Sequence, residues 1–117
     1  MAKRTAAKLD AIPIVPSSGN VFADLGVANP DEELAKAKLA SHIRQAIQRR
    51  RLTQVRAGSL MGLDQPKVSA LMNGRLGGFS SDRLMRLLTA LGQDVEIVVK
   101  TKPRSRLRGQ IRVIEAA

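Results

Sequence analysis

Apolar side chains recur every three or four residues along much of the middle of the chain, which is the spacing of one face of an α-helix. The first such stretch begins with Asn29-Pro30-Asp31-Glu32, where Asn can cap, Pro suits the first helical position and Glu can return the cap's hydrogen bond. This pattern predicts a long helix that continues to the arginines at 49–51. Its expected apolar face consists of Leu34, Ala37, Ala40, Ile43, Ala46 and Ile47.

Two short helices joined by a tight turn are predicted between residues 53 and 74. Thr53 can cap the first helix, which is expected to end at Gly62. Asp64 can cap the second, with Pro66 tolerated in its first turn, and Gly74 can end it in the left-handed conformation. The pair therefore reads as a helix-turn-helix motif, against the alternative of a helical hairpin that merely packs.

The second short helix has an apolar side and a polar side. Val68, Leu71 and Met72 are expected to face the core. The outward tips suit the major groove of DNA, where Gln reads adenine, Lys reads guanine and a small apolar side chain can meet a thymine methyl. The candidate base-reading residues are Gln65, Lys67, Ser69, Ala70 and Asn73.

A further helix is predicted after the loop at 76–78. The pattern 79–82, Phe-Ser-Ser-Asp, can open it, with Phe79 placed to pack on Leu84, and Gly92 can end it. Leucines at helical spacing supply its core face. They are Leu84, Leu87, Leu88 and Leu91.

Beyond this helix the pattern changes to alternating β-branched residues. Val95, Ile97 and Val99 share one face of a predicted strand, which needs a partner for its edges. That partner could be a second candidate strand, Gln110 to Ile114, or the same strand of another subunit, so these three residues are the candidate dimer contact. The basic run between the two, 101–109, is either a loop near DNA or a disordered tail.

The N-terminal part offers little to build a core. Residues 1–16 are basic and rich in small side chains and prolines, so a disordered arm is expected, which could fray or touch DNA. Residues 17–29 read as a short docking segment, in which Phe22 and Leu25 either pack on the domain or meet a partner. The predicted organisation continues with a DNA-binding domain at 30–94 and a strand-bearing basic tail at 95–117.

Composition narrows the possible partners. The 117 residues carry a net charge of +10 but only two aromatic side chains, Phe22 and Phe79, so duplex phosphate is favoured over stacking on single strands or RNA. No apolar run reaches the roughly 18 residues of a membrane span and no signal-peptide pattern opens the chain, so a cytoplasmic, nucleoid-associated protein without membrane contact is expected.

Catalytic and metal chemistry find no support in the sequence. There is no cysteine, and His42 is the single histidine, without acidic residues at a ligand-like spacing. The glycines at 74, 77 and 78 are not followed by the Lys-Ser/Thr of a phosphate-binding loop. We therefore expect no enzyme activity and no cofactor.

The helix-turn-helix residues resemble those of the phage-repressor (Cro/cI, or XRE) family. The resemblance rests on a set of matching polar, small and apolar positions: Thr53, Gln54, Ala57, Gly62, Leu63, Asp64, Gln65, Val68, Ser69, Leu71 and Gly74. It implies that Gln54 binds a phosphate, with Thr53 and Arg75 as further phosphate candidates, and that the small Ala57 allows the helices to cross closely. Two residues depart from the pattern: Gly58, inside the first helix, and Ala70, where relatives carry a longer base-reading side chain.

The wider arrangement of the chain is similar to one branch of that family, the HigA-type antitoxins. The similarity spans residues 17–114, and includes the segment 19–26 and the patterns at 79–84 and 91–97. It implies a mainly α, four- to five-helix domain with one or two C-terminal strands used in dimerisation. It also implies a repressor of its own operon that neutralises a RelE/HigB-like toxin, with Phe22 and Leu25 as candidate toxin contacts. The alternatives are a stand-alone XRE-family regulator and a basic RNA- or ribosome-associated protein.

Overall fold

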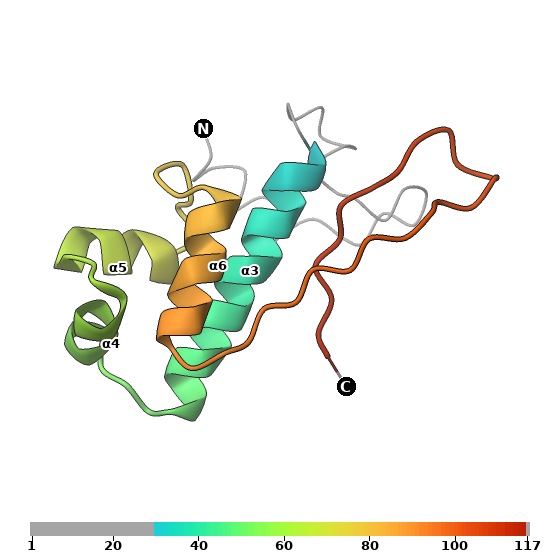
Figure 1. The fold of residues 1–117 in the computed structure, drawn as a ribbon. Helices are drawn as coiled ribbons and strands as arrows, with labels where there is room; N and C mark the ends of the chain where they lie inside the picture. Colours follow the sequence, from blue (N-terminus) through green and yellow to red (C-terminus); the bar gives the residue numbers. More distant parts are fainter. Residues whose placement is uncertain (1–29, 117) are drawn as a thin grey trace.

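The computed structural model describes residues 30–116, and the predictions for the arm at 1–16 and the docking segment at 17–29, including Phe22 and Leu25, lie outside this range. Within the described residues the chain forms four α-helices (Figure 1). Their bounds are α3 Pro30–Arg49, α4 Gln54–Met61, α5 Gln65–Met72 and α6 Ser81–Ala90. The predicted mainly α helix-turn-helix fold is confirmed for this part of the chain.

The two longer helices, α3 and α6, lie side by side, and the short helices α4 and α5 pack along one side of this pair, next to α6 (Figure 1). All four helices contribute to one apolar core. Its most deeply buried large side chains are Ile43, Val68, Leu71, Leu84 and Leu91. Phe79, in the loop before α6, is also buried and belongs to the same core, as its predicted packing role requires.

The predicted apolar face of α3 is correct in its second half and wrong in its first. Ala40, Ile43, Ala46 and Ile47 are buried as expected. In the first half, Ala35 and Leu39 are buried, whereas Leu34 and Ala37 are only partly covered. Positions spaced three residues apart do not stay on one face, because at 3.6 residues per turn each step of three falls about 60° short of a full turn.

Side-chain caps fix the starts of the three shorter helices. Thr53, Asp64 and Ser80 each accept a hydrogen bond from the backbone N–H three residues later, at 3.0, 3.1 and 3.1 Å. Caps of this kind satisfy backbone donors that have no partner inside the helix. The predicted starts of α4 and α5 are therefore confirmed, and Gly62, with φ +69°, makes the left-handed turn between them.

Gly58 lies where α4 comes closest to α5. A Cβ atom at this position would lie 2.9 Å from the carbonyl oxygen of Leu63 and 2.9 Å from Cγ2 of Val68, which is closer than Cβ atoms come in proteins. A glycine inside a helix costs about 1 kcal/mol relative to alanine. Here that cost accompanies a packing requirement, so this departure from the family pattern allows the two helices to approach.

The predicted C-terminal strands are not confirmed. Residues 93–116 contain no assigned strand, and the backbone hydrogen bond seen there, Arg106 N to Pro103 O at 3.2 Å, closes a turn. Val95 and Val113 pack against the helical core, and Glu115 lies 3.8 Å from His42 on α3. A strand requires a neighbouring strand for its backbone groups, and the segment 93–116 finds none among the described residues.

The contact at Gly58 predicts the effect of adding one methyl group. Gly58→Ala should lower the free energy of unfolding by about 1–2 kcal/mol, because the overpacking at Leu63 and Val68 outweighs the gain in helix propensity. Urea unfolding followed by circular dichroism measures this difference. Gly77→Ala is the matched control, since no atom lies within 4 Å of its added Cβ. An alanine variant at 58 as stable as the parent protein would show that the helices are not in tight contact there.

Candidate nucleic-acid interface

The helix-turn-helix motif presents α5 on the surface while anchoring it underneath. Val68 and Leu71 are almost fully buried, and Ala57 of α4 is completely buried where the resemblance requires a small residue. Arg44 of α3 donates from Nη1 to the backbone oxygen of Leu71 at 3.4 Å, which ties the end of α5 to the long helix. The opposite side of α5 is left open for a ligand.

The predicted base-reading residues all lie on the accessible sides of α5. Gln65, Lys67 and Asn73 are exposed, and Ser69 and Ala70 are partly buried. Three of them make contacts within the protein that set the direction of their side chains. The contacts of Gln65 and Lys67 could not be read from the sequence, because they join residues across helices and loops.

Gln65 is held by Gln54, the predicted phosphate-binding residue at the start of α4. Nε2 of Gln65 donates to Oε1 of Gln54 at 3.0 Å. The bond joins the first residues of the two helices, both of which are exposed. A residue predicted to contact the backbone of DNA thus positions a residue predicted to contact a base.

Asn73, at the other end of α5, is also oriented by an internal contact. Its Nδ2 donates to the backbone oxygen of Ser69 at 2.8 Å and lies 3.4 Å from the Ser69 hydroxyl oxygen. The carboxamide therefore caps the end of its own helix. Its oxygen is the atom left for a further partner.

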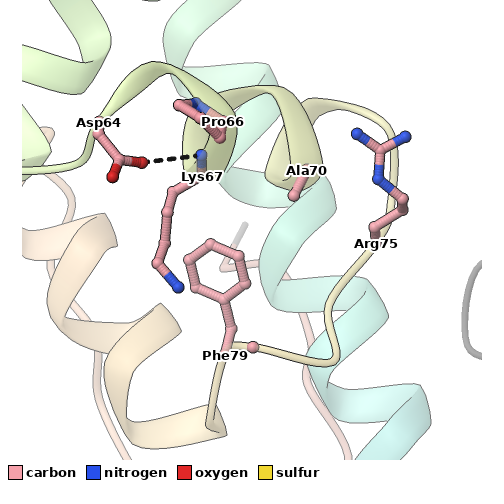
Figure 2. Close-up of a pocket in the computed structure, with 7 residues that line it drawn as sticks. Asp64, Pro66, Lys67, Ala70, Arg75 and Phe79 are labelled. Atoms are coloured by element: carbon pink, nitrogen blue, oxygen red, sulfur yellow. Dashed lines mark hydrogen bonds between the residues drawn. The ribbon is translucent and has the colours of Figure 1, made fainter.

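Lys67 extends along the flank of α5 toward the loop before α6. Its Nζ lies 5.8 Å from the centre of the Phe79 ring, and the guanidinium carbon of Arg83 lies 5.3 Å from the same centre. Both distances suit cation–π attraction. Figure 2 shows the ammonium group beside this ring. The structure thus places the Lys67 charge at the edge of α5.

A hollow of about 270 Å³ opens beside α5. Its apolar wall contains Pro66, Ala70 and Phe79, and cationic Lys67 and Arg75 stand around it (Figure 2). The remaining lining residues are Asp64 and Gly78. Pro66 is exposed here, although from the sequence it was expected only to fit the first turn of the helix and not to belong to the site. The signal was available, since Pro66 lies one helical turn before Ala70.

The other predicted phosphate residues differ in their surroundings. Thr53 is exposed, but its hydroxyl oxygen already accepts the hydrogen bond from Arg56 N. Arg75 is partly buried beside the hollow, just after Gly74 has ended α5 with φ +75°. Arg83 and Arg75 thus add positive charge near α5, whereas Arg86 is paired with Asp82 at 3.1 Å.

The candidate dimer residues Val95, Ile97 and Val99 do not gather into one buried cluster within the described residues. Val95 is partly buried against the core, whereas Ile97, Val98 and Val99 are between 75% and 91% exposed. Apolar side chains on both sides of this segment are therefore open to solvent. Among the large apolar residues of the four described helices, Val55 comes nearest to these values, at 74%.

The described residues contain neither a metal-binding cluster nor a membrane-spanning helix. Between residues 30 and 116 no three His, Cys, Asp or Glu side chains come together in a way that could hold a metal ion. None of the four helices described is long and apolar enough to cross a membrane.

Comparison with known proteins identifies relatives of this arrangement. Residues 21–100 match the family described as Helix-turn-helix domain. A solved structure described as a candidate XRE family transcriptional regulator is similar with a TM-score of 0.70 and 51% sequence identity, over 74% of this chain and 97% of that chain. No curated protein matches the chain.

Proposed function

The chain belongs to the XRE family of helix-turn-helix transcriptional regulators, and we propose that it represses transcription as a two-fold dimer bound to an inverted-repeat operator. The observation that carries this proposal is the exposed side of α5, where oriented amide side chains lie beside the cations Lys67 and Arg75. Amide side chains and the Lys67 ammonium group can read base edges in the major groove, and Arg75 can hold a phosphate.

The proposal of a dimer follows from the size of the reading element. One helix of eight residues contacts few base pairs, so two copies are needed for a specific site. The half-sites are then expected one helical turn, about 34 Å, or a multiple of it apart. The exposed run 97–99 supports a contact between copies, in which Val95, Ile97 and Val99 pair across the axis as an antiparallel strand.

We further propose, on the resemblance to HigA-type antitoxins, that the protein neutralises a RelE/HigB-like toxin. Phe22 and Leu25 are the proposed toxin contacts, aided by acidic residues at the start of α3 such as Glu32. In this proposal the toxin does not bind to α5, so the complex still binds DNA. A stand-alone regulator of the same family is the alternative, and α5 would serve it equally well.

Base-reading and phosphate-binding residues should give different mutational effects. Gln65→Ala or Lys67→Ala should cost about 1–3 kcal/mol on the operator and relax base preference, whereas Arg75→Ala should weaken binding to all sequences alike. Gel-shift competition between operator and scrambled duplexes measures both quantities. Gln54→Ala is expected to weaken all sequences as well, although it also removes the partner of Gln65. Unchanged operator preference in both the Gln65 and Lys67 variants would contradict the role of α5.

A charge on the exposed C-terminal segment should prevent dimerisation. Ile97→Lys would place an ammonium group on the proposed buried face, and sedimentation at micromolar concentration should then show a monomer. Val55→Lys is the matched control, because Val55 is 74% exposed and Ile97 is 75% exposed. The control variant should stay dimeric. A dimeric Ile97→Lys protein would move the subunit contact elsewhere.

The antitoxin role is tested with the product of the neighbouring gene. If that gene encodes a small toxin, the full chain should co-purify with it and rescue growth on co-expression. The double variant Phe22→Ala, Leu25→Ala should lose both properties while retaining operator binding, and Gln65→Ala should retain the toxin. Rescue by the double variant would place the docking site elsewhere, and the absence of a toxin gene would favour the stand-alone regulator.

A further inference from the structure

The accessible side of α5 carries carbon surface where it borders the hollow. Pro66 and Ala70 are four residues apart, so they are neighbours on one face of the helix, and both line the hollow beside it. Figure 2 shows the two residues on successive turns of α5. Proline has no backbone N–H, and neither side chain has a donor or acceptor. Together they form an apolar strip.

The polar groups around this strip point to its sides. The Gln65 amide nitrogen is bound to Gln54, and the Asn73 amide nitrogen is bound to Ser69. The Lys67 ammonium lies beside the Phe79 ring. None of these three contacts places a hydrogen-bond donor or acceptor between Pro66 and Ala70. A base edge that faces Pro66 and Ala70 therefore meets apolar atoms.

We infer that Pro66 and Ala70 select thymine in the operator half-site by contact with its 5-methyl group, an inference that rests on the proposed role of α5 as the reading helix. Among the four base pairs, the thymine methyl is the one apolar group in the major groove. Burying a methyl-sized group against apolar atoms favours binding by about fourfold. Arg75, at the edge of the hollow, is placed to hold a flanking phosphate.

Deoxyuridine provides the direct test, because it lacks the methyl group and keeps the base pairing of thymine. An operator is first selected from random duplexes with the full-length protein, and each thymine is then replaced singly by uracil. At one or two positions in each half-site, replacement should weaken binding about fourfold or more. At the same positions, a 5-methylcytosine·guanine pair should bind better than a cytosine·guanine pair.

A variant links the methyl effect to the strip. Ala70→Ser has nearly the same volume but brings a hydroxyl group to the contact, so the difference between thymine and uracil should shrink at the affected position. Ala90→Ser, the same substitution at an exposed position of α6 outside the proposed reading surface, should leave that difference unchanged. An equal thymine preference in the parent protein and Ala70→Ser would show that the methyl is read elsewhere.

The selection and the uracil replacements distinguish a failure of the methyl contact from a failure of the proposed repressor function. If an operator is selected but every uracil replacement changes binding less than twofold, the methyl inference is wrong and the proposed repressor function stands. If no sequence is enriched from the random duplexes, α5 is not a reading helix, and both the proposed function and this inference are overturned.

Discussion

The two helices of the motif depend on a core that they could not form alone. Each of α4 and α5 has eight residues, whereas an isolated helix in water needs roughly 12–15 residues even to be marginal. Packing against the α3–α6 pair stabilises the two short helices. For α5 this packing is made by the buried side chains of Val68 and Leu71. Arg44 of α3 and Arg50, directly after α3, add hydrogen bonds to backbone oxygens near the ends of α5 and α6, at 3.4 and 3.1 Å. A change in the core is therefore expected to reach the DNA-facing surface.

The same construction explains why the accessible side of α5 is oriented before any ligand arrives. Side chains that already have defined positions lose less conformational freedom on binding. Gln65 and Asn73 each have an internal hydrogen bond, and Lys67 is attracted to the Phe79 ring. The loop that carries Phe79 is itself fixed in the core. Residues far apart in the chain thus cooperate to prepare one surface.

Local chemistry made most of the helical part predictable from sequence. Caps such as Thr53 and Asp64 act within three residues, so their pattern located the starts of α4 and α5. The first half of α3 was assigned the wrong face, because its buried side depends on the accumulated helical angle and on what packs against it. The predicted strand at 95–99 needs a partner strand, and the described residues 30–116 supply none. The directions of Lys67 and Gln65 were out of reach, since Phe79 and Gln54 determine them from 12 and 11 residues away.

Because of the close approach at Gly58, the position of α5 relative to α4 does not depend on the side chains that are proposed to read DNA. The position of α5 relative to α4 is set by backbone contact at Gly58 and Leu63 and by the buried Val68, none of which belongs to the proposed reading surface. The exposed residues of α5, in turn, carry little of the packing. Over evolutionary time the operator and the outer side chains can therefore diverge together while the scaffold stays constant. Related chains with the same small residue at this crossing are expected to share a docking geometry and to differ in the sequences that they recognise.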